Sequence, residues 1–336
     1  MANISILGAG GWGIAIGVLL NNSGHKVTMW SAVDREVTML TEKRENEISL
    51  PGIIISEDIQ ITGDLNEAVN NKDIIVLAVA SSYIRSTAGK LKGIVKEGQI
   101  IVNVAKGIED DTLMTLTDVI SQEVPGADVA VLSGPSHAEE VGRGLPTTCV
   151  VGAKTRETAM YIQNIFASPV FRVYISPDIL GIELGGALKN VIALAAGIAD
   201  GLGYGDNTKA AIITRGITEI SRLGIVMGAK SLTLYGLSGI GDLIVTCASM
   251  HSRNRRAGIL IGKGYTMEEA AKEVNMVVEG VYSAKAAVKL ARKYQVNMPI
   301  IETVNQILFE GLSAKDAVKE LMLRDKTIEH PELLWE

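Results

Sequence analysis

Residues 2–13 read ANISILGAGGWG, in which a short apolar strand runs directly into the glycine-rich segment 8–13. The glycines have the G-x-G-x-x-G spacing, and an apolar-periodic segment follows them, as this motif requires. Gly8 would permit a tight turn, Gly10 would let the backbone approach a pyrophosphate, and Gly13 would let the next helix pack closely on the sheet. Free N–H groups at that helix N-terminus would face the phosphates. The stretch predicts a dinucleotide-binding unit; a glycine-rich turn in an ordinary α/β domain is the alternative.

The N-terminal segment 1–25 is uncharged and largely apolar, yet it predicts neither a signal peptide nor a membrane span. It lacks a basic region at its start, and six glycines interrupt its apolar residues. The other long apolar run, 191–198, is followed closely by Asp200. We therefore expect a soluble, cytoplasmic protein with no membrane span.

The composition is that of an aliphatic α/β protein. The chain has 336 residues, enough for two domains, and combines 47% hydrophobic residues with 4% aromatic residues and 35 glycines. A net charge of −6 argues against a nucleic-acid-binding surface, which usually has a basic excess. Cys149 and Cys247 form neither a disulfide framework nor metal-ligand spacing. We expect no nucleic-acid partner and no metal.

The first half of the chain alternates strand and helix patterns. Near-continuous aliphatic runs such as 73–80 are typical of a sheet buried on both faces. The alternation predicts a doubly wound parallel sheet of the Rossmann type. The expected strands are 4–7, 26–30, 59–61, 74–79, 100–104, 129–132, 148–151 and 171–175, and the expected helices are 34–44, 83–91, 113–121 and 156–166.

After Pro177 the pattern becomes helical. The segment 176–178 reads as a helix start, so we expect a dinucleotide-binding domain over 1–178 and an all-α substrate-binding domain over 179–336. A cleft between two such domains is where a substrate usually binds. The expected helices are 179–200, 207–223, 267–274, 281–294, 300–310 and 314–323.

Lys189 stands out in the second half of the chain. It lies in a helix pattern that is apolar or small almost all round, with no carboxylate three or four residues away. A buried, unpaired lysine is costly unless it faces a polar cavity, where it can give a proton to a carbonyl oxygen during hydride transfer. Snorkelling to the surface is the alternative. The neighbouring Asn190 is a candidate ligand for a substrate hydroxyl.

Two other segments follow predicted strands. Lys106 lies at the carboxyl end of a strand, where ligands bind in open α/β sheets, although a solvated loop lysine is the alternative. Ser136 and Glu139 have the spacing of a capping box, and a helix start of this kind can also bind an anion or cofactor. His137 alone carries no assignment.

The segment 239–256 brings together acidic, hydroxyl and basic side chains. Asp242 and Thr246 are one helical turn apart, and a basic cluster follows them, made of Arg253, Arg255 and Arg256. Arginine suits phosphate through its planar donor fork, while a charged surface is the alternative. Glu279 lies in an apolar setting. It is a candidate ligand for a ribose or for the nicotinamide amide, and a loop acid without such a role is the alternative.

Together these segments resemble the NAD(P)-dependent glycerol-3-phosphate dehydrogenases over nearly the whole chain. The resemblance rests on GAGGWG, AKGIE, SGPSHAEEV, LKNVIALAAGIADGLGYGDNTKAA, GIGDLIVTC and SRNRR, which follow the family's order. It implies reversible reduction of dihydroxyacetone phosphate to sn-glycerol 3-phosphate for phospholipid synthesis. It also implies NAD or NADP as cofactor and a homodimer.

Carried over position by position, the resemblance makes Lys189 the proton donor and acceptor. The implied substrate site consists of Lys106, Gly134, Ser136, Lys189, Asp242, Thr246, Ser252, Arg253 and Asn254, with Arg253 near the phosphate. The implied cofactor contacts, beside Gly8, Gly10 and Gly13 of the motif, are Gly11, Trp12, Lys106, Ala138, Arg253, Val277 and Glu279.

The second predicted strand ends without the usual cofactor-reading residue. Ser31 and Ala32 follow it, where an NAD site usually has an acid and an NADP site an arginine nearby. Members of the family often carry His or Arg at the position of Ala32. Because Ser31 and Arg35 are available to a 2′-phosphate and no acid repels it, the sequence favours NADP.

Two rival functions remain open at this stage. β-Hydroxyacid dehydrogenases also join a Rossmann domain to a helical domain with a Lys-Asn pair, but they prefer a carboxylate substrate. A dinucleotide sensor without turnover belongs to a different class, and the ordered set of lysines, acid and arginines argues against it.

Overall fold

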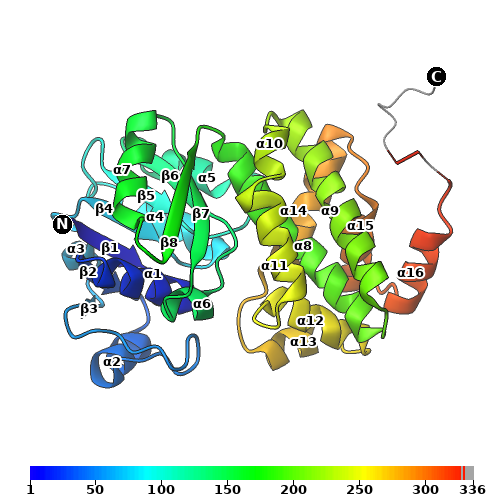
Figure 1. The fold of residues 1–336 in the computed structure, drawn as a ribbon, viewed down its shortest axis with the longest axis horizontal. Coiled ribbons are helices and arrows are strands. Elements are labelled where there is room, and N and C mark those ends of the chain that lie inside the picture. Colours follow the sequence, from blue (N-terminus) through cyan, green and yellow to red (C-terminus); the bar gives the residue numbers. More distant parts are fainter. Residues whose placement is uncertain (327, 330–336) are drawn as a thin grey trace.

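The computed structural model describes residues 1–326 and 328–329, and its first half is built on an eight-stranded sheet (Figure 1). The predicted strands are all present, with ends that shift by one or two residues. They are β1 (Asn3–Leu7), β2 (Lys26–Trp30), β3 (Gln60–Thr62), β4 (Ile74–Leu77), β5 (Ile100–Asn103), β6 (Asp128–Ser133), β7 (Thr147–Gly152) and β8 (Phe171–Ser176).

The strand order is β3-β2-β1-β4-β5-β6-β7-β8, in which the first six strands have the order of a Rossmann dinucleotide-binding sheet. The prediction of a parallel sheet is wrong for one pair, because β6 and β7 are antiparallel, with Leu132 opposite Val151. A parallel crossover usually needs a substantial helix, but the connection 134–146 holds only α6 (Ala138–Gly142). The chain therefore turns back, and β8 runs parallel to β7.

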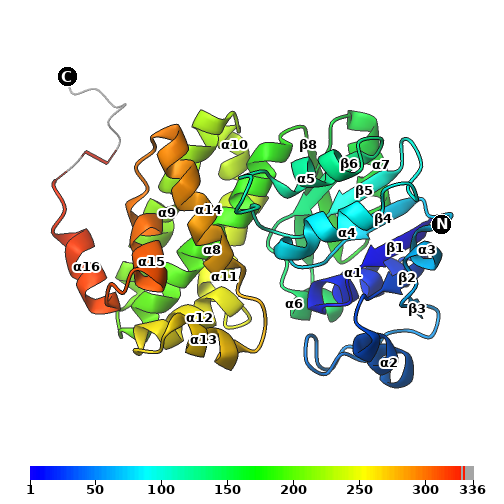
Figure 2. The same ribbon diagram turned by 180° about the vertical axis from the view of Figure 1, so that it is seen from behind.

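Helices cover both faces of the sheet (Figure 2). Apolar side chains of α1 and α7, such as Ile14 and Phe166, are buried in one hydrophobic cluster. Those of α4 and α5, such as Ile84 and Ile120, are buried in a second cluster on the other side. The helices of this half are α1 (Gly11–Asn22), α2 (Asp34–Lys43), α3 (Leu65–Val69), α4 (Ile84–Lys90), α5 (Leu116–Glu123), α6 and α7 (Arg156–Phe166), with a 3₁₀ turn η1 at Ser81–Tyr83.

The second half is helical and is organised around α8 (Ile179–Gly201). The predicted helix start is confirmed, since the Asp178 side chain accepts a hydrogen bond of 3.0 Å from the Gly181 N–H. The remaining elements are α9 (Asp206–Met227), α10 (Ser231–Leu234), the π-helical η2 (Leu237–Gly241), α11 (Asp242–Ala248), α12 (Arg253–Gly262), α13 (Met267–Val274), α14 (Glu279–Tyr294), α15 (Pro299–Phe309) and α16 (Ala314–Met322).

Two segments are long and apolar enough to cross a membrane, Ile179–Gly201 and Ser231–Ala248. The most apolar window of the first is 89% buried within the protein, as befits the core helix of a helical domain. The second is divided among α10, η2 and α11. Both segments lie in the helical half, and the most apolar window of the second is 39% buried.

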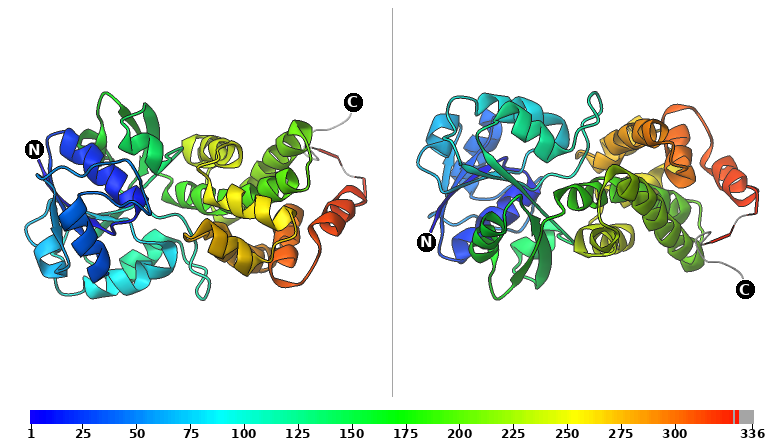
Figure 3. Two further views of the ribbon diagram at one scale, coloured as in Figure 1. Left: turned by 90° about the horizontal axis from the view of Figure 1, so that it is seen from below. Right: turned by 90° about the horizontal axis from the view of Figure 1, so that it is seen from above.

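The strands end at Ser176 and α8 begins at Ile179, close to the predicted domain boundary. Figure 3 shows the sheet-containing half and the helical half next to each other along the long axis of the molecule. The division into 1–178 and 179–336 stays a prediction, and residues 327 and 330–336 of the second range lie outside the described part. The structure also corrects the expected helix 113–121. Leu113 has a positive φ of 61°, and the helix begins at Leu116 after Thr115 caps it.

The loop between β5 and α5 fastens the two halves together. Its Ile108 is part of the hydrophobic cluster around α8, and its Asp110 forms a 2.8 Å ion pair with Lys289 of α14. From the other side, the buried Glu183 of α8 accepts a 2.9 Å hydrogen bond from the Thr117 N–H at the start of α5. Because Lys106 lies in the same loop, these contacts fix its backbone relative to α8.

The buried Glu219 of α9 gives a stability prediction. It accepts hydrogen bonds from the Ile300 and Ile301 N–H groups at the start of α15, and burial raises its pKa to about 7 from 4.5. The folded protein therefore holds a proton there that the unfolded chain releases above pH 4.5. This stabilisation is complete below pH 4.5 and is lost as the pH rises through 7. Relative to Glu219→Gln, the wild-type free energy of unfolding should fall by about 1–3 kcal/mol over that interval.

Urea unfolding of both proteins at several pH values measures this difference, with the exposed Glu273→Gln as the control. A difference between wild type and Glu219→Gln that does not change with pH would contradict the assignment.

Candidate active site

Three charged side chains meet where the sheet faces the helical half. Lys189 comes from the middle of α8, Asp242 from the first residue of α11, and Lys106 from the loop after β5. The π-helical η2 leads directly into Asp242, and such segments are frequent at functional sites. A glycine is required at Gly239, where a Cβ would lie 1.8 Å from the Leu234 carbonyl oxygen. The backbone there is packed too tightly for a side chain.

Lys189 is buried but not unpaired. Only 5% of the residue is exposed, so the alternative of a snorkelling lysine is wrong. Its Nζ forms a close ion pair with the Asp242 carboxylate and donates a 2.6 Å hydrogen bond to the Thr246 Oγ1. Thr246 in turn donates to the Asp242 carbonyl oxygen at 2.6 Å. The counter-charge that the local sequence of α8 lacks is thus supplied by α11.

Lys106 approaches the same carboxylate from the sheet. Its Nζ donates to Asp242 Oδ2 at 2.6 Å, to the Gly134 carbonyl oxygen at 3.1 Å and to Ser136 Oγ at 3.4 Å. The side chain is only 18% exposed, so the alternative of a solvated loop lysine is wrong. One carboxylate therefore holds two ammonium groups that come from opposite halves of the chain.

Burial and charge set the protonation of this cluster. Burial lowers the pKa of Lys189 to about 7, an effect that Asp242 opposes and Lys106 reinforces. Burial alone would raise the pKa of Asp242, but the two ammonium groups outweigh it and hold that pKa below its usual range. At neutral pH, Asp242 is a carboxylate and Lys189 can both hold and release a proton. This is the property of a general acid and base.

The segment after β6 lies against Lys106, but not as the sequence predicted. Ser136 does not cap α6, whose N-cap is His137 without a side-chain cap bond. The Ser136 hydroxyl instead donates to the Gly134 carbonyl oxygen at 2.9 Å, in a turn where Gly134 has a φ of 149°. The capping-box prediction for Ser136 and Glu139 is therefore wrong, because α6 begins at Ala138, one residue later than an N-cap at Ser136 requires.

His137 is a residue that sequence reasoning passed over. Its Nε2 is buried without a hydrogen-bond partner among the described residues, and its ring lies 5.8 Å from that of His251. Burial lowers its pKa, and the Lys189 and Lys106 charges act in the same direction. The only sequence signal was its place inside the segment 133–141, since nothing in its spacing distinguishes it from an ordinary histidine.

The three arginines of the predicted basic cluster lie at the start of α12 and have different surroundings. Arg255 pairs with Asp200 at 2.7 Å and Arg256 is exposed, so neither belongs to a common clamp with Arg253. The Arg253 guanidinium makes no hydrogen bond or ion pair with the described residues. Burial lowers its pKa, while Glu279 and Glu139 oppose that effect. Arg253 is thus a partly buried cation that is available to an anionic ligand.

Side chains next to Arg253 organise the backbone. Ser252 caps α12 by accepting a 3.2 Å hydrogen bond from the Arg255 N–H. The Asn254 side chain donates to Asn190 Oδ1 at 2.9 Å and accepts from the Gly280 N–H at 2.8 Å. These hydrogen bonds connect α12 to α8 and α14. They hold the side chain of Asn190, which directly follows Lys189 on the buried helix α8.

The glycine-rich turn fits a dinucleotide. Gly8 has a φ of 121°, and a Cβ at Gly13 would lie 2.0 Å from the Gly8 carbonyl oxygen, so both positions require glycine. At Gly10, by contrast, a Cβ would meet nothing within 4 Å, which leaves the backbone open to a phosphate group. The buried Trp12 Nε1 has no partner within the described residues. A Cβ at Gly11 would lie 3.8 Å from that of Ala138, which brings a second predicted cofactor residue to this turn.

Glu279 is attached to the sheet half rather than to the lysines. It begins α14 and accepts hydrogen bonds from Ser81, one from the N–H at 3.1 Å and a short one from the hydroxyl. Burial raises its pKa, and these hydrogen bonds and Arg253 oppose the shift. Val277 precedes it and is 37% exposed. Glu279 therefore ties α14 to the loop after β4, near the cofactor-binding edge of the sheet.

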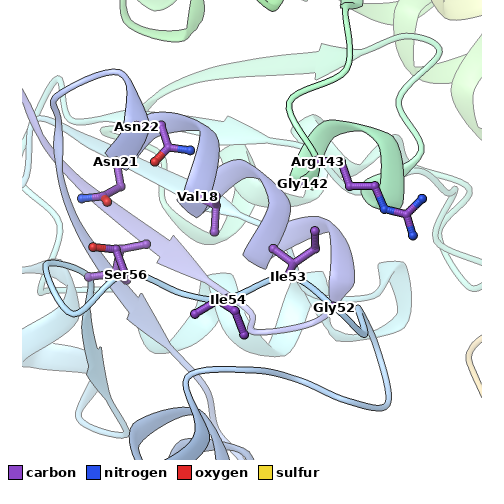
Figure 4. A pocket seen from close by; sticks show the side chains of 10 residues that line it. Val18, Asn21, Asn22, Gly52, Ile53, Ile54, Ser56, Gly142 and Arg143 are labelled. Carbon is purple, nitrogen blue, oxygen red and sulfur yellow. The ribbon is translucent and has the colours of Figure 1, made fainter.

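Cavities support this location only in part. A small cavity beside Lys106 is also lined by Gly107, Ser133, Glu183 and Gly186, among others, and Lys189 does not line it. A larger one of about 450 Å³ lies elsewhere, between α1, the loop around Ile54 and α6 (Figure 4). None of the predicted site residues lines the larger cavity. Within the part of the chain that the structure describes, no group of His, Cys, Asp and Glu could hold a metal ion.

The site can now be compared with known proteins. A family model described as the NAD-dependent glycerol-3-phosphate dehydrogenase N-terminus matches residues 3–159, and the corresponding C-terminus model matches residues 178–319. A glycerol-3-phosphate dehydrogenase (NAD(P)+) of Agathobacter rectalis is 64% identical over 335 residues, and the match covers 100% of both chains. The corresponding enzyme of Fusobacterium nucleatum is 63% identical, with 98% of this chain and 99% of the relative covered.

Solved structures agree with these matches. The glycerol-3-phosphate dehydrogenase of Coxiella burnetii has a TM-score of 0.93 and 36% identity, and the match covers 96% of this chain and 99% of that one. A D-mandelate dehydrogenase with NADH and anilino(oxo)acetate has a TM-score of 0.63 at 15% identity, with 96% and 100% covered. The second likeness shows a shared fold alone.

Proposed function

This chain belongs to the NAD-dependent glycerol-3-phosphate dehydrogenase family and is an NAD(P)-dependent oxidoreductase, and on that premise we propose that it reduces dihydroxyacetone phosphate reversibly to sn-glycerol 3-phosphate. The observation that carries the proposal is the buried cluster of Lys189, Asp242 and Lys106. It offers a proton donor of neutral pKa at the junction of the dinucleotide-binding sheet and the helical half.

In this proposal Lys189 acts on the carbonyl oxygen. When bound, a reduced dinucleotide would supply the hydride that adds to the ketone carbon. Lys189 Nζ donates a hydrogen bond to the ketone oxygen, stabilises the negative charge that develops there and then gives up its proton. Asp242 and Thr246 fix the direction of the ammonium group. In the reverse direction neutral Lys189 takes the proton from the hydroxyl, which a pKa of about 7 permits.

The remaining polar groups are assigned to binding. The Arg253 guanidinium, which has no protein partner in the described residues, would bind the phosphate. Asn190 and Asn254, which are joined by a 2.9 Å hydrogen bond, would orient the substrate hydroxyl groups. The proposed substrate contacts also include Lys106, Gly134, Ser136 and Ser252. The proposed dinucleotide contacts are the glycines of the turn 8–13, Trp12, Ala138, Val277 and Glu279.

The substrate class is tested by a panel of carbonyl compounds. Oxidation of NADH and of NADPH is followed at 340 nm with dihydroxyacetone phosphate, unphosphorylated dihydroxyacetone and a set of β-keto and 2-keto acids. We expect turnover with the phosphorylated ketone alone. Preference for a keto acid would support the hydroxyacid dehydrogenase alternative, and tight dinucleotide binding without any turnover would support a sensor.

Arg253 gives a prediction on substrate binding. We expect Arg253→Gln to raise the KM for dihydroxyacetone phosphate about 100-fold or more, because it removes the charge that pairs with the phosphate. The exposed neighbour in Arg256→Gln is the matched control and should change KM less than about threefold. Both variants are compared by steady-state kinetics at fixed ionic strength. An unchanged KM in Arg253→Gln would place the phosphate elsewhere.

The cellular setting follows from the same proposal. A cytoplasmic enzyme of this kind would supply sn-glycerol 3-phosphate for glycerophospholipid synthesis. It would act as a homodimer without a nucleic-acid partner, in keeping with the net charge of −6. Sedimentation velocity of the purified chain tests the dimer.

A further inference from the structure

A carboxylate lies at the end of β2, where the sequence had indicated none. Ser31 follows the strand directly and is buried, with 4% of the residue exposed. The Ser31 hydroxyl donates a 2.6 Å hydrogen bond to Glu36 Oε2, and the Ser31 Oγ accepts a 3.1 Å hydrogen bond from the Val33 N–H. Glu36 lies in the first turn of α2. The position of α2 therefore brings the Glu36 carboxylate, five residues after Ser31, back to the end of β2.

The strand end to which Glu36 is hydrogen-bonded lies beside the glycine-rich turn. β1 and β2 are parallel neighbours in which Leu7 pairs with Trp30, and the Gly8 N–H donates to the Trp30 carbonyl oxygen at 3.0 Å. In dinucleotide-binding sheets, the end of the second strand is where the ribose next to the adenine lies. An acid there accepts a hydrogen bond from the 2′-hydroxyl of NAD, and it repels the 2′-phosphate of NADP.

We propose that Glu36 makes this enzyme select NADH over NADPH, with Ser31 as the positioning residue that holds its carboxylate. The inference rests on the NAD(P) dependence of the family and on the dinucleotide site proposed above. It does not depend on which ketone is reduced.

The surrounding charges favour the same selection. Ala32, at the strand end, has no charge, and the exposed Arg35 forms no hydrogen bond or ion pair with the described residues. On the other side, the Ser31 N–H donates to the Thr62 carbonyl oxygen at 3.3 Å, and Thr62 forms a short hydrogen bond with the Glu67 carboxylate. A 2′-phosphate at the end of β2 would thus approach the Glu36 carboxylate, with the exposed Arg35 next to Glu36 in the sequence.

The preference for NADP rested on the absence of an acid near the strand end, and the hydrogen bond from Ser31 to Glu36 places one there. The sequence shows no acid directly after the strand, but it does not show that α2 folds Glu36 back to Ser31. Arg35 remains the competing residue, because an arginine near the strand end can accommodate a 2′-phosphate. The two assignments predict opposite orders of affinity.

Equilibrium binding without substrate separates them. Dissociation constants for NADH and NADPH are measured by nucleotide fluorescence with the wild-type chain and with Glu36→Gln, Ser31→Ala and Arg35→Gln. We expect wild type to bind NADH at least about 10-fold more tightly than NADPH. Glu36→Gln should reduce that ratio about 10-fold, chiefly through tighter NADPH binding, and Ser31→Ala should reduce it less. Glu42→Gln, an exposed carboxylate on the same helix, should keep the wild-type ratio.

The opposite results would overturn the inference. One is wild-type binding of NADPH at least as tight as that of NADH, with Arg35→Gln weakening NADPH alone. The other is a ratio that Glu36→Gln leaves unchanged. Selective NADH binding by a protein that fails to reduce dihydroxyacetone phosphate would leave the inference standing and remove the proposed reaction.

Discussion

Lys189→Ala is expected to lower kcat for reduction of dihydroxyacetone phosphate about 1,000-fold or more, with the dissociation constant for the dinucleotide changed less than about threefold. The side chain is the one proposed to meet the ketone oxygen, so its loss removes both the proton and the charge stabilisation in the transition state. The glycine-rich turn, which is proposed to bind the dinucleotide, belongs to the other half of the chain. Stopped-flow turnover and cofactor fluorescence measure the two quantities separately.

Two further variants serve as controls for Lys189→Ala. Lys189→Met fills the same buried space without the ammonium group and should be as inactive as Lys189→Ala. Lys263→Ala removes an exposed lysine after α12 and should retain wild-type kcat. Activity within about 10-fold of wild type in Lys189→Met would remove Lys189 from the chemistry.

Asp242→Asn should lower kcat for reduction about 100-fold or more through the protonation of Lys189. Without the carboxylate, two buried ammonium groups face each other, and the pKa of Lys189 falls further below its usual value. Lys189 then lacks a proton to donate at neutral pH. The variant should regain part of its activity as the pH is lowered, since acid restores the protonated lysine. A pH profile of kcat between pH 5 and 9 checks this shift.

Asp200→Asn is the matched control for Asp242→Asn. Asp200 also pairs with two basic side chains, Lys209 at 2.9 Å and Arg255 at 2.7 Å, but it lies outside the lysine cluster. Its loss should alter stability without moving the pH profile. If Asp242→Asn lowers kcat by a constant factor at every pH, Asp242 acts on structure rather than on the proton of Lys189.

The local features of this fold follow from its sequence. The G-x-G-x-x-G spacing predicts the turn after β1, which requires glycine at Gly8 for its positive φ and at Gly13 for close backbone packing. The continuous aliphatic runs predict the strands, because such runs are buried in a sheet that helices cover on both faces. The antiparallel β7 was missed because strand direction depends on the connection 134–146. Its short helix is not evident from local periodicity.

The sequence indicated candidate site residues but not the pairings between their side chains. An apolar helix with one lysine indicated Lys189, yet its partner Asp242 is 53 residues away and only tertiary packing joins them. The same holds for Glu36, which a search for an acid directly after β2 cannot find. His137 has an unpartnered buried nitrogen only in the folded chain. Arg255 and Arg253 look alike in sequence, and only the folded chain gives Arg255 its partners Asp200 and the Ala248 carbonyl oxygen.

Transfer of isotope tests the central claim most directly. The purified protein is given dihydroxyacetone phosphate and NADH that carries deuterium at both C4 positions, and the glycerol 3-phosphate formed is examined by mass spectrometry and NMR. The account predicts one deuterium at C2 of the product for each NADH oxidised. Oxidation of NADH without deuterium at C2, or no oxidation with either this cofactor or NADPH, would contradict it.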